Sequence, residues 1–472
     1  MSLPNTHHAP AEIAAALSGA KEIFFCGIGG IHMSALAEFC LCRGFRVHGS
    51  DRVESETTTR LRRHGARVFI GHDAAHITGA DALIYTLALS PGNPEYAAAG
   101  RLGIPCISRA DFLGYLMSDY PRRIGVAGSH GKSTVTALLA EIFHTAGRNP
   151  SVLCGAPMRP FDSSFLIGAG DDFIFEACEY RDSFLCFSPT IALLLNTDLD
   201  HVDYFKDKES ICRSFAAFAA LPRKDGALLY NADDEGARAA AAQTPAKTYA
   251  FSLSPGADFF PQEVTEQNGF FSFLPVTPAG ALPRVTLCVP GRHNVYNALA
   301  AIGAATLSGL PGDVISKSVS LFHGAGRRME YHGLFCGARL YDDYAHHPRE
   351  IEAALDAARK MMGGNGRLFA VFQSHTYSRT AAFYREICAA LRAADRVFVA
   401  PVYAARESDR RGMSPALLAE GIGARASAPG DLPAIARALS VELSPGDLLL
   451  VMGAGDVNRI FREFSEKPFT DG

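Results

Sequence analysis

The segment Gly128-Ser129-His130-Gly131-Lys132-Ser133-Thr134 has the most specific chemistry in this sequence. It follows the apolar run 123–127 and precedes a helical pattern over residues 135–143. Backbone N–H groups of a glycine-rich turn at a helix start can bind phosphates, a lysine can reach the β and γ oxygens, and a serine hydroxyl can bind Mg²⁺. The motif is shorter than the usual G-x-x-x-x-G-K-[ST], because Val126 stands where its first glycine would be. We predict a nucleoside triphosphate site, with an ordinary turn as the alternative.

A second glycine-rich turn, Gly27-Ile28-Gly29-Gly30, follows the apolar run 22–26, and Asp51 lies about 20 residues further on. This arrangement resembles the dinucleotide motif G-x-G-x-x-G, whose helix start binds a diphosphate. His32 occupies the place of the third glycine, which normally allows close packing of helix and strand. We therefore predict a ligand that contains a diphosphate. A redox dinucleotide and a purely structural turn remain the alternatives.

Carboxylates and a histidine follow two apolar runs of the middle region. Glu176 ends the run 173–176, and His201 lies in Asn196-Thr-Asp-Leu-Asp-His201 after the run 191–195. Carboxyl ends of parallel strands face the ligand crevice of an open sheet. Mg²⁺ prefers oxygen ligands and tolerates a histidine as a minority ligand. Glu176 and His201 are therefore candidates for a metal site beside the phosphates, and solvated loop residues are the alternative.

Two further clusters are rich in polar side chains. In Gly291-Arg-His293-Asn294-Val-Tyr-Asn297, His293 and Asn294 either cap a helix or stack on and hydrogen-bond to a purine base. In the last third, Asp342-Asp-Tyr-Ala-His-His-Pro348 and Gln373-Ser-His-Thr-Tyr-Ser-Arg379 flank apolar runs. The planar fork of Arg379 suits carboxylate binding. We do not predict zinc at the paired histidines, because no acid-rich set of ligands accompanies them.

Apolar runs that lead into glycines and then into helical patterns occur in three regions, which is typical of parallel α/β sheets. The fold class predicted is therefore α/β: a Rossmann-like domain over residues 1–120, a P-loop-type ATP-binding domain over 121–326 and a second Rossmann-like domain over 327–472. Short apolar runs separated by Gly and Pro between residues 255 and 290 predict a small antiparallel part on the middle domain.

Composition excludes several classes of protein. The chain has 472 residues, 45 Lys and Arg against 49 Asp and Glu, and 48% hydrophobic residues, which is typical of a folded globular protein of about three domains. A net charge of −4 gives no sign of a nucleic-acid partner. Without a long apolar run or a leader-like start, we expect no membrane association and a cytoplasmic location. The cysteines are odd in number, 11, and lack C-x-x-C spacing, so we expect reduced thiols in the core and neither metal ligands nor a disulfide framework.

Together these motifs resemble the Mur ligase family over residues 22–456, nearly the whole chain. The features that carry the resemblance are the two glycine-rich turns, Met33-Ser34, Glu176, His201, the segment 291–297, Arg327-Arg328 and the motifs 342–348 and 372–380. The last two are the most diagnostic among the members of the family. His32, Ser133 and Ala345 depart from the family pattern.

The resemblance assigns roles residue by residue. The nucleotide sugar falls to Gly27, Gly29, Gly30, Ser90 and Asn93, beside His32 and Asp51. The resemblance assigns ATP and Mg²⁺ to the loop residues Gly128, Ser129, His130, Gly131, Lys132, Ser133 and Thr134. Glu176 and His201 are assigned to the metal. The rest of ATP is assigned to His293, Asn294, Asn297, Arg328 and Asp343. The amino acid and acyl phosphate fall to Tyr344, His346, His347, His375 and Arg379. Direct catalytic roles are expected for Lys132, Glu176, His201 and His347.

The activity that the resemblance implies is ATP-dependent ligation of L-alanine to the lactyl carboxylate of UDP-N-acetylmuramate in peptidoglycan synthesis. An acyl phosphate is the implied intermediate, ADP and phosphate are the implied products, and a monomer or homodimer is expected. Three alternatives stay open: a ligase that joins a recovered murein tripeptide to the same nucleotide sugar, an NAD(P) dehydrogenase built on the first glycine turn, and a nucleotide-sugar-binding protein without catalysis.

Overall fold

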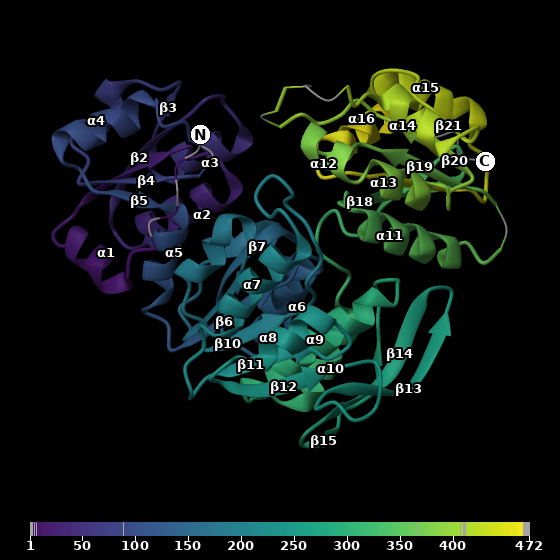
Figure 1. Ribbon diagram of the computed structural model, residues 1–472, viewed down its shortest axis with the longest axis horizontal. Helices are drawn as coiled ribbons and strands as arrows, with labels where there is room; N and C mark the ends of the chain where they lie inside the picture. Colours follow the sequence, from purple (N-terminus) through teal and green to yellow (C-terminus); the bar gives the residue numbers. More distant parts are fainter. Residues whose placement is uncertain are drawn as a thin grey trace. The chain divides into compact units, whose positions relative to one another are not determined.

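A computed structural model describes residues 3, 5, 7–87, 89–364, 366–405, 407–408 and 412–465 (Figure 1). The chain forms two compact units. The first contains residues 1–197 and 212–250, and the second contains residues 198–211 and 251–472. Each unit carries two sheets. The domain boundaries at residues 120 and 326 stay predictions, because this division into two units does not test them.

The first sheet of unit 1 is parallel, with the strand order β3-β2-β1-β4-β5. Its strands are β1 (Glu22–Cys26), β2 (Arg46–Asp51), β3 (Arg67–Ile70), β4 (Ala82–Tyr85) and β5 (Cys106–Ser108). The helices that connect and flank them are α1 (Pro10–Ala16), α2 (Ile31–Cys42), α3 (Glu56–Arg63), η1 (Ala74–Ile77), α4 (Pro94–Leu102) and α5 (Arg109–Met117). Phe24, Phe25 and Cys26 are fully buried because helices cover both faces of such a sheet. This is the Rossmann-like architecture predicted.

The second sheet of unit 1 has the order β12-β11-β10-β6-β9-β7-β8. The β11–β10, β10–β6, β6–β9 and β9–β7 pairs are parallel, and the β7–β8 pair is antiparallel. Its strands are β6 (Arg122–Ala127), β7 (Ser151–Met158), β8 (Ser163–Leu166), β9 (Asp172–Glu176), β10 (Ile191–Leu194), β11 (Ala227–Asn231) and β12 (Lys247–Phe251). Its helical segments are α6 (Lys132–Thr145), η2 (Arg159–Phe161), η3 (Tyr180–Cys186), α7 (Lys208–Ala219) and α8 (Glu235–Ala241). Strand β6 lies between β10 and β9, so the phosphate loop that follows it leaves from the middle of the sheet.

Unit 2 begins its folded part with a small antiparallel sheet, as predicted for residues 255–290. The strands are β13 (Phe260–Gln267), β14 (Phe270–Thr277), β15 (Gly280–Ala281) and β16 (Val285–Thr286). Two helices, α9 (His293–Leu307) and α10 (Gly312–Leu321), follow it. Alternating burial along β14 shows that one face of this sheet packs inward and the other faces out.

The last sheet has the order β17-β18-β22-β19-β20-β21, with only the β17–β18 hairpin antiparallel. Its strands are β17 (Glu330–Phe335), β18 (Ala338–Asp343), β19 (Leu368–Phe372), β20 (Arg396–Val399), β21 (Ala426–Ser427) and β22 (Leu448–Met452). The helical segments are α11 (Pro348–Met361), α12 (Tyr377–Ala382), α13 (Tyr384–Leu391), α14 (Pro415–Ile422), α15 (Leu432–Glu442), η4 (Val457–Arg459) and α16 (Ile460–Ser465). Strands β19 and β22 are buried at every residue, as central parallel strands are.

Two observations bear on the compositional predictions. All eleven cysteines are free thiols, but the predicted core position holds only for the buried Cys26, Cys40, Cys154 and Cys388. Five others are partly buried, and Cys42 and Cys336 are exposed, so the prediction is wrong for these two. Within the ranges described, no helix has the length and apolar character needed to cross a bilayer.

Candidate active site

The phosphate loop of unit 1 runs from β6 into α6. Gly128 has φ +146°, and a Cβ there would lie 2.9 Å from the Cβ of Leu195, so glycine is required. Gly131 has φ +87° and is the N-cap of α6, with no side chain capping the helix. The first N–H groups of α6 therefore remain available for an anion. The amide of Asn196 fixes the loop, because its Oδ1 accepts from the His130 N–H at 2.8 Å and its Nδ2 donates to the His130 carbonyl at 3.0 Å.

Lys132 is buried at the start of α6 and is held by an acidic partner. Its Nζ lies 2.9 Å from Oε2 of Glu179 and also donates to the Ser129 carbonyl at 3.2 Å. Burial lowers the pKa of Lys132, but the acidic groups around it, Glu179 first among them and then Glu176, together outweigh burial and raise this pKa above its ordinary value. Lys132 is therefore a fixed cation at the phosphate loop.

The structure brings together two of the three predicted metal ligands. The Ser133 hydroxyl donates to Oε2 of Glu176 at 2.8 Å, and the same oxygen accepts from the Gly155 N–H at 2.8 Å. A hydroxyl and a carboxylate at the phosphate-binding end of a helix are oxygen donors of the kind that Mg²⁺ prefers. His201 belongs to unit 2, so its predicted place beside Glu176 stays a prediction.

The other glycine turn of unit 1 joins β1 to α2 and is tied to β2. The Gly29 N–H donates to Oδ2 of Asp51 at 2.9 Å, and a Cβ on Gly29 would lie 2.8 Å from that oxygen. Asp51, at the end of β2, therefore holds the glycine turn in place. The ring Nδ1 of His32 lies 3.1 Å from a guanidinium nitrogen of Arg109, and burial lowers the pKa of His32 to about 3.

The two remaining residues predicted to bind nucleotide sugar precede α4. Asn93 is the N-cap of this helix, because its Oδ1 accepts from the N–H groups of Glu95 and Tyr96 at 2.9 and 3.0 Å. Ser90 is exposed, and its hydroxyl accepts from the Gly92 N–H at 3.3 Å. Asn93 therefore has a structural role that the sequence did not indicate.

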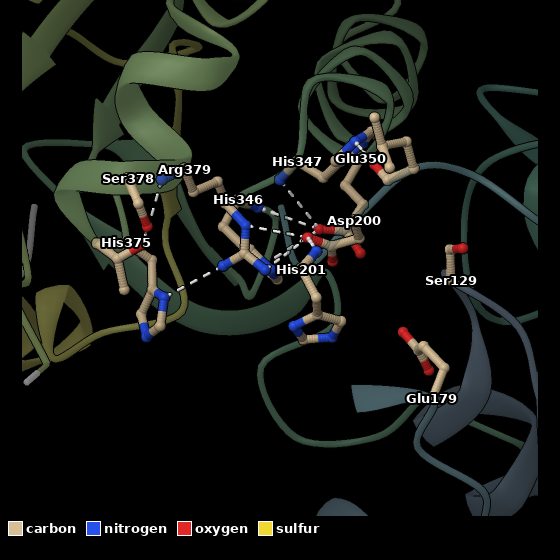
Figure 2. Close-up of polar contacts among 12 residues, drawn as sticks. Ser129, Glu179, Asp200, His201, His346, His347, Glu350, His375, Ser378 and Arg379 are labelled. Carbon is tan, nitrogen blue, oxygen red and sulfur yellow. Dashed lines mark hydrogen bonds and ion pairs between the residues drawn. The ribbon is translucent and has the colours of Figure 1, made fainter. Parts of the chain in front are cut away.

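In unit 2, Arg379 lies at the centre of a cluster of polar side chains (Figure 2). Its Nη2 and Nε lie 2.6 and 3.1 Å from Oδ1 of Asp200, and its Nη1 lies 3.2 Å from Nδ1 of His375. Burial alone raises the pKa of Asp200, but the charges of His201 and Arg379 hold it well below its usual range. Burial, with His346 and Arg379 nearby, lowers the pKa of His375 to about 3. The ring of His375 stacks on that of Tyr403.

The adjacent histidines at the start of α11 differ in their contacts. His346 Nδ1 lies 3.0 Å from the carbonyl of Tyr344 and 3.3 Å from Oε2 of Glu350, and burial lowers the pKa of His346 to about 4. His347 is the N-cap of α11; its Nε2 lies 3.1 Å from the Leu199 carbonyl. A backbone carbonyl therefore orients each ring: that of Tyr344 for His346 and that of Leu199 for His347.

Arginines surround the aromatic ring that follows β18. The guanidinium carbons of Arg327 and Arg328 each lie 5.0 Å from the centre of the Tyr344 ring. Asp343 is buried and accepts from the N–H groups of Met329 and Ala345, both at 2.8 Å. Burial raises the pKa of Asp343 to about 6. Asp343 therefore shapes the turn that presents Tyr344 and Arg328.

The predicted purine-binding segment forms the start of α9. His293 is exposed, whereas Asn294 and Asn297 are buried. Asn294 Nδ2 donates to the Pro290 carbonyl at 2.7 Å, and Asn297 Nδ2 donates to Asn294 Oδ1 at 2.9 Å. The two amides therefore brace the helix start without capping it: the N-cap of α9 is Arg292, with no side-chain cap, so the structure does not bear out the capping alternative. Their contact with a base stays a prediction.

Two acidic residues, one in each unit, had no role in the sequence analysis. Glu179 pairs with Lys132, and Asp200 pairs with Arg379. Asp200 stands in the motif 196–201 that the sequence analysis noted, and Glu179 follows the predicted metal ligand Glu176 by three residues. Their position beyond the carboxyl ends of β9 and β10 indicated that they could belong to a site. Which cation each one pairs with depends on the folded chain.

The parallel sheets and the phosphate loop define a nucleotide-dependent enzyme of the α/β class. More specifically, this chain belongs to the Mur ligase family. The family models described as "Mur ligase family, catalytic domain", "Mur ligase middle domain" and "Mur ligase, glutamate ligase domain" match residues 22–121, 126–305 and 327–455. The family resemblance and the fold class predicted from the sequence are confirmed.

Individual members of the family are similar over nearly the whole chain. A UDP-N-acetylmuramate–L-alanine ligase from Caldicellulosiruptor bescii is 42% identical over 93% of this chain and 97% of its own. The crystal structure of a UDP-N-acetylmuramate-alanine ligase from Thermotoga maritima matches with a TM-score of 0.79 and 26% identity, covering 94% of this chain and 98% of that one. A murein peptide ligase from Psychrobacter arcticus shares the fold, with a TM-score of 0.70 and 23% identity over 95% of this chain and 99% of its own.

Proposed function

We propose that this protein joins L-alanine to the lactyl carboxylate of UDP-N-acetylmuramate, with ATP converted to ADP and phosphate. The observation that carries the proposal is the 42% identity to an L-alanine ligase over 93% of the chain. The phosphate loop with its fixed cation, Lys132, supports the same conclusion. The place of this reaction is the assembly of peptidoglycan precursors, and the location that we propose is the cytoplasm.

The first step is activation of the acid. The lactyl carboxylate attacks the γ-phosphorus of ATP, a carboxylate-to-phosphorus bond forms, the bond to the β-phosphate oxygen breaks, and ADP leaves. Lys132 and the first N–H groups of α6 bind the phosphates and stabilise the negative charge that develops on the transferred group. Glu179 keeps Lys132 charged and directed at the loop until the phosphates compete for it.

Mg²⁺ fits this part of the site. Ser133 and Glu176 supply a hydroxyl and a carboxylate within hydrogen-bond distance of each other, and His201 is the third residue that we propose to hold metal. When bound, Mg²⁺ neutralises phosphate charge and polarises the phosphoryl oxygens. Thr134 and Ser129 complete the set of loop residues that we propose to contact the phosphates.

The second step forms the amide. The neutral amine of alanine attacks the acyl carbon, phosphate leaves, and the amine gives up its proton. His346 and His347 are the two candidates for the proton acceptor, because a backbone carbonyl faces Nδ1 of His346 and Nε2 of His347 and so leaves the other ring nitrogen of each to accept a proton. With the proton on Nδ1, the lone pair of His346 is on Nε2. Arg379, oriented by Asp200 and His375, binds the alanine carboxylate.

The three predicted domains divide these tasks. Residues 1–120 bind the nucleotide sugar through the turn at Gly27, Gly29 and Gly30. Residues 121–326 bind the ATP phosphates, and residues 327–472 contribute the amino-acid side together with Arg328 and Asp343 for ATP.

Release of ADP tests the proposal. The full-length protein is incubated with ATP, Mg²⁺ and UDP-N-acetylmuramate, and L-alanine, glycine, L-serine and an L-Ala-D-Glu-diamino-acid tripeptide are offered in parallel. ADP release that depends on L-alanine supports the proposed reaction. Release with the tripeptide alone assigns the chain to murein recycling, and the absence of turnover with all acceptors contradicts catalysis.

A further inference from the structure

A buried cluster of four side chains lies beside the carboxyl end of β1 and is used by no step above. Cys26 ends β1, and Glu95 is in the first turn of α4. His72 lies two residues before η1, and His76 lies within η1. The Cys26 thiol and the Glu95 carboxylate have no solvent exposure. The side chains of His72 and His76 are 21% and 19% exposed, so the cluster is open to solvent on the histidine side only.

The potential ligand atoms of this cluster converge on one point. Oε2 of Glu95 lies 3.0 Å from Sγ of Cys26 and 2.9 Å from Nδ1 of His72. All three atoms lie within 4.8 Å of one another. The Ser50 hydroxyl is in the same place, 2.7 Å from Oε2 of Glu95 and 3.0 Å from Nδ1 of His72. His76 binds the other oxygen of Glu95, with Nδ1 2.9 Å from Oε1.

We propose that Cys26, His72 and Glu95 form a binding site for a thiophilic divalent cation, Zn²⁺ in the first place. A thiolate, an imidazole and a carboxylate are the three ligand types that zinc takes in proteins, and three protein ligands leave a fourth position for water or the Ser50 hydroxyl. Mg²⁺ and Ca²⁺ do not suit a site with a thiolate and an imidazole.

Charge balance favours a divalent cation at the site formed by Cys26, His72 and Glu95. Cys26 loses its thiol proton to solvent when its sulfur binds the metal, so Cys26 and Glu95 contribute two negative charges and neutral His72 contributes none. A divalent cation brings the net charge of the cluster to zero, which removes most of the cost of burying the ions. His76 is a positioning residue: it contacts Glu95 on the oxygen away from Cys26, as partners of metal-binding carboxylates do.

The backbone connects this cluster to the glycine turn. Cys26 immediately precedes Gly27, and the carbonyl of Ser50 accepts from the N–H groups of Gly27 and Ile28 at 2.8 and 2.9 Å. A cation bound by Cys26 and adjacent to Ser50 therefore contacts both β1 and β2, the strands that hold the glycine turn in place. The cation site borders the turn that we propose for the nucleotide sugar, but its ligands are none of the residues assigned to a substrate. Metal binding and turnover are therefore separate readouts.

Cobalt spectroscopy tests the site on the full-length chain. The protein is prepared without a metal-affinity tag, freed of metal with a chelator under reducing conditions, and titrated with Co²⁺, whose bond to a thiolate gives an intense near-ultraviolet charge-transfer band. We expect this band to saturate at one Co²⁺ per chain and to be removed by Zn²⁺. Cys26→Ser abolishes the band, whereas Cys42→Ser, which changes an exposed thiol of the same domain, leaves it unchanged.

Two further variants keep the test decisive if Cys26→Ser does not fold. His72→Asn retains the thiol and should weaken Co²⁺ binding, and His76→Ala should lower the affinity by about 10- to 100-fold, the usual effect of removing a partner of a ligand. Circular dichroism checks that each variant is folded. No charge-transfer band in the wild-type protein, or a band that persists in folded Cys26→Ser, overturns the proposal.

Discussion

The ammonium of Lys132 lies 2.9 Å from the carboxylate of Glu179, and both side chains are almost completely buried. The lysine at the phosphate loop is thus held in place before any phosphate arrives, because its charge is matched by an acid that follows β9. Such preorganisation reduces the cost of ordering the cation when the transition state forms.

Removal of the Lys132 ammonium should lower the rate of ADP formation and also reduce stability, because it leaves the buried carboxylate of Glu179 without its partner. We expect Lys132→Ala to lower kcat for ADP formation by about 10²–10³, the range measured when one charge-stabilising donor is lost from an active site. Lys247→Ala, which changes an exposed lysine of β12 in the same unit, should keep wild-type activity. Full turnover by Lys132→Ala would contradict the proposed ATP site.

A second prediction concerns the Arg379–Asp200 pair. These side chains are only 9% and 7% exposed, so Arg379→Ala leaves a buried carboxylate without its partner and should reduce the free energy of unfolding by about 3–5 kcal/mol. Arg359→Ala is the matched control, because its pair with Asp395 has side-chain exposures of 42% and 40% and should be worth less than about 1 kcal/mol.

Urea unfolding of both variants measures this difference. The double variant Arg379→Met with Asp200→Asn should recover part of the lost stability, since it leaves no unpaired charge. Equal losses in Arg379→Ala and Arg359→Ala would show that the buried pair does not have the strength inferred here.

The strands of this fold could be predicted because their apolar runs end at residues that cannot continue them. The segment 22–26 was predicted with the bounds that β1 has. Helix α6 begins at Lys132, three residues before the predicted pattern, because polar Ser133 and Thr134 hide its first turn. A pattern of apolar residues does not predict a first helical turn whose side chains are polar because they bind a ligand.

The pairs that build the site could not be predicted in the same way. Lys132 and Glu179 are 47 residues apart, and Arg379 and Asp200 are 179 residues apart. Motifs identify residues that can carry charge, but the pairing of charges depends on which strands are neighbours. The same reason explains why the Cys26–Glu95 contact was not foreseen, although Cys26 itself was noted as a core thiol.

A third prediction follows from the buried histidines. In the folded chain the pKa of His346 is about 4, against 6.5 for an ordinary histidine. Between these values the unfolded chain binds a proton that the folded chain does not, so stability falls as the pH is lowered through this window. At about 1.4 kcal/mol per pH unit, His346 should cost about 2 kcal/mol between pH 7 and pH 5.

Urea unfolding at pH 7, 6 and 5 tests this sign. The His346→Gln variant should lose less stability than the wild type on acidification, by about 2 kcal/mol at pH 5. The His64→Gln variant, which changes a side chain that is 51% exposed, should retain the wild-type pH dependence. An identical pH dependence in His346→Gln and the wild type would mean that His346 is not kept neutral by burial.

The last prediction concerns the turn between β1 and α2. A Cβ on Gly29 would lie 2.8 Å from Oδ2 of Asp51 and 3.1 Å from Cγ2 of Thr58, closer than side chains pack. Gly29→Ala must therefore move Asp51 and break its hydrogen bond to the turn. Because the phosphate loop follows β6 in the other sheet of the unit, we expect a higher KM for the nucleotide sugar with little change in the KM for ATP.

Gly100→Ala is the control for this variant. Gly100 is in α4 of the same domain, and no atom lies within 4 Å of the Cβ it would gain. Alanine is the better helix former, so this control should be at least as stable as the wild type and unchanged in both KM values. If Gly29→Ala raises the KM for ATP as much as that for the nucleotide sugar, the turn does not act on the sugar nucleotide alone, and the assignment of residues 1–120 to that substrate fails.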